Sequence, residues 1–260
     1  MRSALMVPSA LRAVRKIASP GPSIYQHLPF VGRFSVDVEP GKSFQLESRG
    51  DVVENDLFWA GFGKSWEADS LKRWVQLAKS SKVILDIGAN TGVFALSAQT
   101  INPGATVLAM EASARTANRL RQNVRMNDYP IIVEEAAASD ADEVLTFYDF
   151  PGEHQYSASL QPSMGGSIES KVQAYRLDSV LDRHGLGKID LMKMDVERHE
   201  PAALRGMRGR LESDRPTIFI EVLDDECRRG IEEALSGFDY SWEKLDDDEG
   251  RNFLLTSASR

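Results

Sequence analysis

Acidic residues stand at the ends of two successive predicted strands, with glycines in the turn after the first. The apolar run 83–87 contains Asp86 and leads into Gly88 and Gly92, whereas the next apolar run ends at Glu111. Glycines have no Cβ atom, so their backbone N–H groups can approach a ligand closely. The first carboxylate can accept hydrogen bonds from a cationic group, and the second has the spacing that places an acid on ribose hydroxyls. This combination favours S-adenosylmethionine as the cofactor.

Asn90 separates this turn from the dinucleotide-binding type. A nicotinamide dinucleotide favours Gly-x-Gly-x-x-Gly, and Asn90 stands where the second glycine is expected. Asp86 would also repel a pyrophosphate. A glycine turn that only joins a strand to a helix would leave Asp86 and Glu111 unexplained. We therefore place Asn90 in the cofactor site, and we expect Asn90 or Thr91 to cap the helix that follows.

A second chemically informative stretch spans residues 189–201. A buried strand is predicted to end near Asp195, and Pro201 suits the first turn of the next helix. Asp195 and Glu197 precede that helix by too many residues to cap it, whereas Glu200 is placed to interact with the helix dipole. We expect Asp195 and Glu197 to lie beside the cofactor strand, facing a transferable methyl group.

A hydroxyl acceptor must lose a proton during methyl transfer, which requires a base within hydrogen-bond reach. The candidates are Asp195, Glu197, His199 and the loop residue His154. Lys193 is expected to orient a carboxylate, because the ordinary pKa of lysine is near 10.4. Two mechanisms stay open. The carboxylates deprotonate the acceptor directly, which we favour, or they hold a divalent cation together with Glu221.

Further cofactor contacts are expected on both sides of these stretches. Glu67 precedes a predicted helix over 70–79 and either flanks the cofactor cleft or complements the helix dipole. Ala137, just past the third strand of the series, is small enough to lie against a flat adenine. Ser139 or Asp140 could reach the adenine amino group. Ala112, which follows Glu111, completes the predicted cofactor site.

The elements that position these residues alternate between strand and helix. Strands are predicted at 83–87, 106–110, 131–135, 189–195 and 217–222, with helices between them. Such alternation implies a parallel sheet with right-handed crossovers. A final hairpin, Tyr240–Leu245 with Asn252–Thr256, would close the sheet. The predicted fold is α/β, a mostly parallel Rossmann-like sheet of the class I methyltransferase type closed by a C-terminal antiparallel hairpin.

The predicted organisation has three parts. Residues 1–36 form a basic extension, 37–80 a β-hairpin and lead-in helix, and 81–260 the Rossmann-like domain. Within that domain, strands near 144–148 and 171–175 bound a flap insertion at about 141–176. The basic extension could loosely contact an anionic membrane, but we favour a flexible or packing segment. We accordingly expect that deleting residues 1–20 leaves the melting temperature nearly unchanged.

Composition limits the remaining function classes. The 260-residue chain has a net charge of −8 and 42% hydrophobic residues, which argues for a soluble protein without a nucleic-acid partner. No segment reads as a membrane span. The single cysteine, Cys227, cannot form an internal disulfide and suits a reducing compartment, so we expect the cytoplasm. No CxxC or HExxH metal motif is present. A homo-oligomer stays open.

Taken together, these residues resemble the FkbM-type S-adenosylmethionine-dependent methyltransferases. The resemblance extends over most of the chain and is most specific in the turn 86–92 and in the Lys-x-Asp-Val-Glu stretch 193–197. Arg198 and Ala112 depart from it, standing where the family commonly has glycine and proline. Arg198 would place a bulky cation beside the acceptor site. The resemblance implies O-methylation of a hydroxyl on a small-molecule or glycan acceptor, such as a sugar, polysaccharide or natural product.

Three rival functions differ in what they require of the sequence. A nicotinamide-dependent oxidoreductase is disfavoured by Asn90. An adenine-N or RNA methyltransferase is expected to carry an Asn/Asp-Pro-Pro-aromatic stretch, where this chain has Asp-Val-Glu-Arg at 195–198. A non-catalytic S-adenosylmethionine-binding subunit stays open, because cofactor binding and turnover use overlapping residues.

Overall fold

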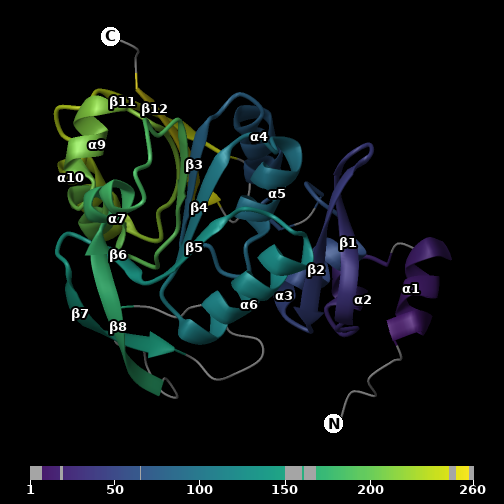
Figure 1. Cartoon of the computed structure of the whole chain (residues 1–260). Coiled ribbons are helices and arrows are strands. Elements are labelled where there is room, and N and C mark those ends of the chain that lie inside the picture. Colours follow the sequence, from purple (N-terminus) through teal and green to yellow (C-terminus); the bar gives the residue numbers. More distant parts are fainter. Residues whose placement is uncertain are drawn as a thin grey trace.

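A seven-stranded sheet forms the centre of the part of the chain that the structure describes (Figure 1). The computed structural model describes residues 8–17, 20–64, 66–149, 160, 168–245 and 250–257. The strand order is β11-β12-β10-β9-β3-β4-β5. These strands are β3 (Val83–Ile87), β4 (Thr106–Glu111), β5 (Ile132–Glu135), β9 (Leu191–Met194), β10 (Thr217–Glu221), β11 (Tyr240–Lys244) and β12 (Asn252–Ser257).

The pairing confirms the predicted Rossmann-like architecture. Strands β10, β9, β3, β4 and β5 pair in parallel, and β12 pairs antiparallel with both β10 and β11. All five residues of β3 are buried, as a central strand covered on both faces requires. Their side chains alternate, so that Ile84 joins one hydrophobic cluster and Leu85 the other.

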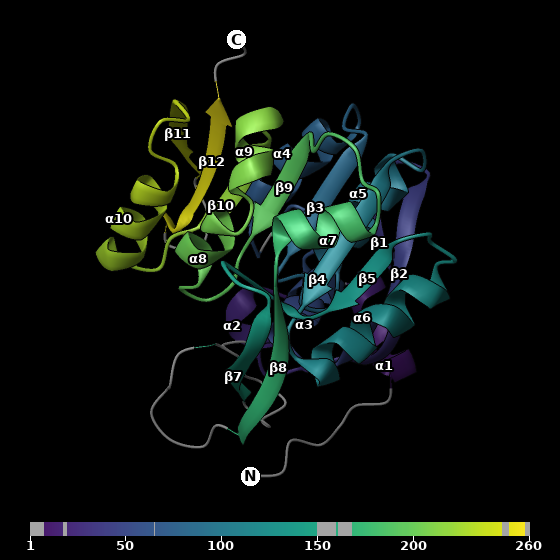
Figure 2. The ribbon, with the colours of Figure 1, turned by 60° about the vertical axis from the view of Figure 1, so that its left-hand side comes forward.

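Helices cover both faces of this sheet (Figures 1 and 2). In α4 the apolar residues Leu71, Trp74, Val75 and Ala78 are all buried, which confirms the predicted apolar face. One face is covered by α4 (Ala68–Ala78), α5 (Val93–Ile101) and α6 (Ala114–Met126); the other is covered by α7 (Leu177–Arg183), α8 (Glu200–Arg205), α9 (Arg208–Ser213) and α10 (Asp225–Ala234).

The predicted N-terminal hairpin is present but begins earlier than expected. Strands β1 (Val31–Glu39) and β2 (Lys42–Arg49) pair antiparallel, so the boundary expected at residue 37 falls inside β1. Three short helices accompany the hairpin: α1 (Pro8–Ile17), α2 (Pro22–Tyr25) and α3 (Val52–Trp59). Leu11 of α1 is only 1% exposed and belongs to the core cluster. This part of the basic extension therefore packs on the fold.

A second, three-stranded sheet has the order β6-β8-β7. Its strands are β6 (Ala137–Ser139), β7 (Glu143–Asp149) and β8 (Ile168–Arg176), and the last two match the strands predicted around the insertion. Figure 2 shows β7 and β8 projecting below the central sheet. Most of the segment between β7 and β8, His154 included, lies outside the described residues.

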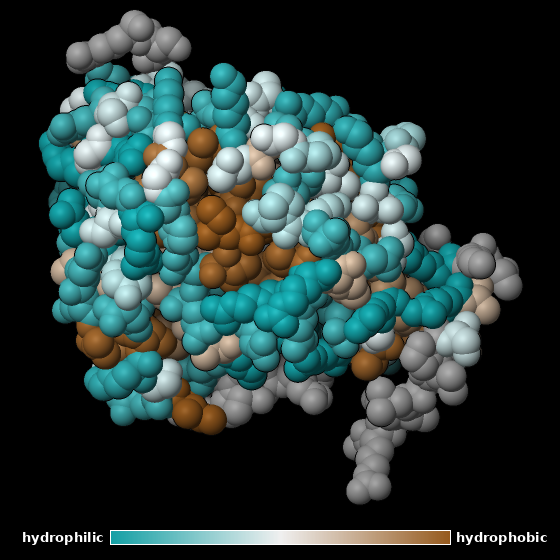
Figure 3. All heavy atoms as spheres, viewed as in Figure 1, coloured by the Kyte–Doolittle hydropathy of each residue, from teal (hydrophilic) through white to brown (hydrophobic). Residues whose placement is uncertain are grey.

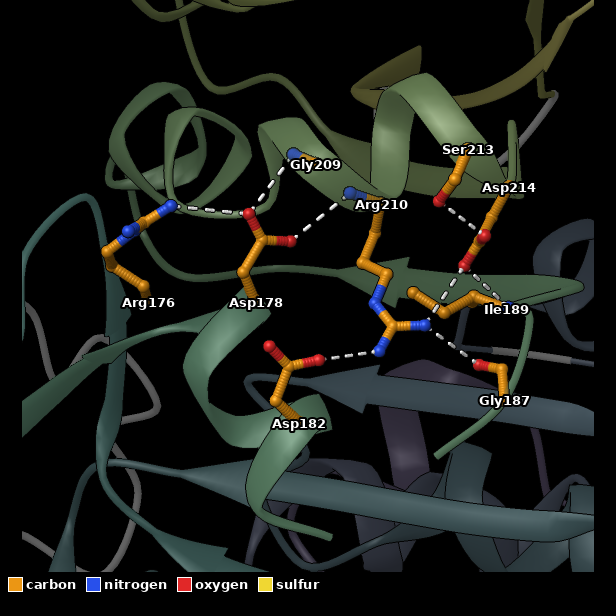
Figure 4. A network of polar contacts seen from close by, with 9 residues as sticks. All are labelled: Arg176, Asp178, Asp182, Gly187, Ile189, Gly209, Arg210, Ser213 and Asp214. Carbon is orange, nitrogen blue, oxygen red and sulfur yellow. Dashed lines mark hydrogen bonds and ion pairs between the residues drawn. The ribbon is translucent and has the colours of Figure 1, made fainter. Parts of the chain in front are cut away.

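A network of polar contacts fixes α7 and α9 beside the start of β9 (Figure 4). Asp178 accepts hydrogen bonds from the backbone N–H groups of Gly209 and Arg210, at 3.1 and 3.2 Å, in the first turn of α9. The Arg210 guanidinium pairs with Asp182 at 2.9 Å. Asp214 in turn accepts from the backbone N–H of Ile189 at 3.0 Å. These contacts hold the strand that ends at the site residues.

The molecular surface is largely hydrophilic in the view of Figure 3, with hydrophobic side chains gathered near its middle, over the part where Figure 1 draws β3, β4 and β5. Among the described residues, no helix combines the length and apolar character needed to cross a membrane.

Candidate functional site

A cavity of about 250 Å³ lies at the carboxyl ends of β3, β4 and β9. This is where open α/β sheets bind their ligands. Of the predicted site residues, those lining the cavity are Glu67, Gly88, Asn90, Glu111, Ala112, Ala137, Asp195 and Glu197. The fold thus brings together Glu111 at the end of β4 and Asp195 just after β9, which lie about eighty residues apart in the sequence.

Glu111 is held rigidly at the end of β4. Its Oε2 accepts a hydrogen bond from the backbone N–H of Asn90, and its Oε1 accepts one from Ser113, both at 2.9 Å. Burial raises the pKa of Glu111 to about 7, although these two hydrogen bonds oppose the rise. Asn90 itself has φ +50°, a left-handed conformation that the Glu111 contact stabilises. The strand-end acid and the glycine turn therefore form one unit.

Gly88 is required by a close approach of two backbones. A Cβ atom at this position would lie 1.7 Å from the carbonyl oxygen of Asp195, far inside van der Waals contact. Gly88 also has φ +79°, which favours glycine. The glycine therefore lets the cofactor turn pack directly against the end of β9 and brings Asp195 to the cavity.

Asp86 and Gly92 do not line the cavity, contrary to the predicted cofactor contacts. The Asp86 side chain is buried, and its Oδ2 accepts a hydrogen bond from the backbone N–H of Ala95 at 2.9 Å. Asp86 thereby accepts a backbone N–H of the first turn of α5, a contact that had been expected from Asn90 or Thr91. The N-cap position itself is Gly92, at φ +98°. Burial raises the pKa of Asp86 to about 6. Its role here is to join β3 to α5.

Lys193 orients Asp195, as predicted. The lysine Nζ donates a hydrogen bond to Asp195 Oδ2 at 2.8 Å and lies 4.8 Å from the centroid of the Phe94 ring. Burial alone would lower the pKa of Lys193, but the carboxylates of Asp195, Glu67 and Asp86 outweigh it and raise the pKa above its ordinary value. Lys193 is therefore a permanent cation and cannot act as a base.

Glu197 lies at the cavity in a strained backbone conformation. It has φ +55°, and Arg198 follows with φ +73°. Burial, together with the negative charges of Asp195 and Glu200, raises the pKa of Glu197 to about 7. The Arg198 side chain does not line the cavity, because its Nε pairs with Asp224 at 2.7 Å. The expectation of a bulky cation beside the acceptor site was therefore wrong.

His199 and Ser139 contact each other and do not reach the cavity. His199 Nε2 lies 3.1 Å from Ser139 Oγ, and neither residue is part of the lining. Burial lowers the pKa of His199. Glu200 lies in the first turn of α8, as expected. Its Oε1 accepts a hydrogen bond from the backbone N–H of Val196 at 2.8 Å. Of the predicted bases within the described residues, Asp195 and Glu197 are therefore the ones at the cavity.

Sequence reasoning missed one wall of the cavity. Asp51 and Val53 come from the start of α3, and Arg119 comes from α6. The Arg119 guanidinium forms a buried ion pair with Asp51 and a second one with Glu54 at 3.2 Å. Asp51 and Arg119 are 68 positions apart, so no local pattern could have paired them.

Among the described lining residues, acidic side chains outnumber basic ones. Six of them are acids, Asp51, Glu67, Glu111, Asp195, Glu197 and Glu221, whereas two are arginines, Arg115 and Arg119. Both arginines are already paired with acids, Arg115 with Asp149 and Arg119 with Asp51. Within the described ranges, no group of three or more His, Cys, Asp or Glu side chains is arranged to hold a metal ion.

The chain is similar in sequence to known methyltransferases. The family model described as "Methyltransferase FkbM domain" matches residues 86–241. The chain is 30% identical over 178 residues to 31-O-demethyl-FK506 methyltransferase FkbM of Streptomyces tacrolimicus, covering 57% of this chain and 66% of that protein. It is 30% identical over 168 residues to 2-O-methyltransferase NoeI of Sinorhizobium fredii, covering 59% and 68%.

The chain spans only part of these proteins. It covers about two thirds of each of the two relatives, and a further match, also 30% identical, takes up only 9% of its much longer relative. Among solved structures, a methyltransferase FkbM from Methylobacillus flagellatus superposes with a TM-score of 0.51 at 18% identity, over 68% of this chain and 44% of that one. That likeness supports the class I methyltransferase fold.

Proposed function

Because the chain belongs to the FkbM methyltransferase family, we propose that it is an S-adenosylmethionine-dependent O-methyltransferase. The proposed acceptor is a hydroxyl group on a sugar, polysaccharide or natural product. The observation that carries the proposal is the joint placement of Glu111, Asp195 and Glu197 around one cavity at the carboxyl ends of the parallel strands. The names of the two curated relatives, both O-methyltransferases, support the same chemistry.

The residues at the cavity fit S-adenosylmethionine, which supplies a methyl group on a positively charged sulfur. The excess of carboxylates in the lining favours a cationic ligand, because opposite charges attract strongly where water is partly excluded. Glu111 ends the second strand of the parallel series, where an acid can accept hydrogen bonds from the ribose hydroxyls. Ala112 and Ala137 leave room for a flat base. The family and the charge of the cavity together support this cofactor.

In this proposal Asp195 positions the acceptor and Glu197 takes its proton. The Asp195 carboxylate is fixed by Lys193, so it can hold an acceptor hydroxyl in a constant orientation. Alignment of two reactants can supply about 7–11 kcal/mol of the barrier. Glu197, with a pKa of about 7, is close to the optimum for a base at neutral pH. We propose direct proton transfer in preference to the alternative with a divalent cation.

Two measurements test this proposal. Isothermal titration calorimetry should detect binding of S-adenosylmethionine and none of NAD, since the cavity lacks the anion-binding character that a pyrophosphate needs. Incubation with panels of glycans and natural products, followed by mass spectrometry, should then reveal an acceptor that gains one methyl group. Binding of the cofactor without turnover on any acceptor would favour the non-catalytic alternative.

The proposed base is tested by Glu197→Gln. This variant should bind S-adenosylmethionine normally but lose about 10²–10⁴-fold in turnover. In the wild type, turnover should fall as the pH drops through about 7, because protonated Glu197 cannot accept a proton. The matched control is Glu233→Gln, an exposed residue of α10, which should keep full activity. Loss of activity with a chelator and recovery with Mg²⁺ would overturn the direct mechanism.

A further inference from the structure

Asp195 and Glu221 stand side by side at the ends of two neighbouring strands. Strands β9 and β10 are parallel, and Met194 of β9 pairs with Ile220 of β10. The residues that follow these two, Asp195 and Glu221, are therefore acids at the same edge of the sheet. Both Asp195 and Glu221 line the main cavity, which places two carboxyl groups at one point of its wall.

The Asp195 and Glu221 side chains lie within hydrogen-bonding reach of each other. An ionised carboxylate only accepts hydrogen bonds, so a bond between two carboxyl groups requires a proton on one of them. Asp195 already accepts a charge-assisted hydrogen bond from the Lys193 ammonium group at 2.8 Å. The proton is therefore better placed on Glu221.

We propose that Glu221 is a positioning residue that carries a proton in the resting protein and donates it to Asp195. Asp195, Glu221 and Lys193 then form a group without net charge at the wall of the cavity. The shared proton does not depend on the proposed reaction, whereas its use in orienting an acceptor rests on the proposed function.

The surroundings of Glu221 favour its neutral form. The charged groups near it are Lys193 of β9, and Asp195 and Glu197 of the loop that follows β9. Glu67, at the start of α4, lines the same small cavity as Glu221. Burial and the two negative neighbours raise the pKa of Glu221 well above its ordinary value, and Lys193 opposes the rise without cancelling it. Asn252 pairs with Glu221 across β12 and adds no charge.

A second, much smaller cavity lies on the other side of this group. It has a volume of about 10 Å³ and is lined by Glu67, Ser70, Lys193, Glu221 and Asn252, among others. This is close to the smallest volume that holds a water molecule. Glu67 and Glu221 line both cavities, so the Glu221 side chain borders the small cavity as well as the main one.

This assignment divides the work among the acids. Glu221 already holds a proton, and Asp195 already accepts two hydrogen bonds. Glu221 therefore cannot take the proton of an acceptor hydroxyl. Asp195 keeps lone pairs that can accept a hydrogen bond from that hydroxyl, and we assign the proton itself to Glu197. With S-adenosylmethionine bound, the cofactor would supply the methyl group to the acceptor oxygen and leave as the neutral thioether, and Glu197 would take up the O–H proton.

Infrared spectroscopy tests the shared proton without any substrate. The difference spectrum between wild type and Glu221→Gln at pH 7 should contain the C=O stretching band of a protonated carboxylic acid in the wild type. Glu233→Gln, a matched change of an exposed glutamate on α10, should remove only a carboxylate band. If Glu221→Gln also removes only carboxylate bands, Glu221 is ionised and the proposal fails.

The stability of the two proteins gives a second, independent readout. A glutamine at position 221 can donate the same hydrogen bond to Asp195, so the fold should be kept. The raised pKa of Glu221 means that the wild type loses stability as the pH rises above the ordinary glutamate range, because the folded state holds a proton that the unfolded state releases. Glu221→Gln lacks this dependence.

The melting temperature of Glu221→Gln relative to wild type should therefore increase between pH 6 and pH 9. The same difference for Glu233→Gln should stay constant. A constant difference for Glu221→Gln would overturn the proposal. Failure to find a methyl acceptor would instead count against the proposed function and would leave both of these readouts intact.

Discussion

Replacing Arg119 by methionine is expected to destabilise the protein strongly. The Arg119 side chain is 8% exposed, and its partners Asp51 and Glu54 are 7% and 0% exposed. Removing one member of a buried ion pair costs about 3–5 kcal/mol, because the remaining charges stay buried without their counter-charge. For a chain of this length, each kcal/mol lowers the melting temperature by about 2–4 °C. We therefore expect a decrease of about 6–20 °C.

The control for this change is Arg115→Met on the same helix. Arg115 pairs with Asp149 at 3.2 Å, and its side chain is 45% exposed. Exposed pairs contribute about 0–1 kcal/mol, so this variant should melt within a few degrees of wild type. Both free energies of unfolding can be measured by urea denaturation followed by circular dichroism.

The pH dependence of the stability of Arg119→Met and a rescue variant provide two further tests. Burial raises the pKa of Glu54, and Arg119 opposes that rise. Without Arg119, Glu54 takes up a proton more readily as the pH falls, so the stability lost in Arg119→Met should shrink between pH 8 and pH 5. Adding Asp51→Asn and Glu54→Gln should recover much of the loss. A cost below about 1 kcal/mol for Arg119→Met would refute the argument.

Four further outcomes are expected. Glu111→Ala should weaken binding of S-adenosylmethionine by about 1–3 kcal/mol in calorimetry, and an unchanged dissociation constant in a folded variant would remove Glu111 from the site. Deleting residues 1–20 should lower the melting temperature, contrary to the expectation from sequence, because it exposes core that buried Leu11 covers, worth about 1.5–3 kcal/mol; an unchanged value would show that α1 does not hold the fold. Arg198→Gly should be neutral or stabilising by up to about 1 kcal/mol, since glycine adopts φ +73° without strain; a marked loss in denaturation would mean that the ion pair of Arg198 outweighs the strain. Gly88→Ala should abolish cofactor binding or folding, because its Cβ would lie 1.7 Å from a backbone oxygen, and a soluble variant with wild-type affinity would contradict this.

Three of the seven non-glycine residues with positive φ in the described part of the chain line the cavity. Glu67, Asn90 and Glu197 all line it, and all three have positive φ values of 43–55°. Such conformations cost free energy and persist where the surroundings impose them, often at functional sites. The left-handed conformation of Arg198 also gives a physical reason why glycine is common at that position in the family that the chain resembles.

The sequence by itself determined the strands and helices of the central sheet and their order along the chain. The apolar run 83–87 indicates a central strand because the signal is local, and the same is true of the helical face at Leu71, Trp74, Val75 and Ala78. Strand ends could be placed as well, so Glu111, Asp195 and Glu197 were correctly expected at one edge of the sheet. Alternation of strands and helices leaves little choice of topology, because crossovers are right-handed.

Only the tertiary structure decided where individual side chains lie. Asp86 and Glu111 both stand at strand ends, yet Asp86 turns to α5 while Glu111 faces the cavity. His199 was predicted as a base but pairs with Ser139 from a strand sixty positions earlier. A residue's direction depends on which neighbours supply hydrogen bonds and space, and those neighbours are distant in sequence. For the same reason the contact between Asp195 and Glu221 exists only because β9 and β10 are adjacent.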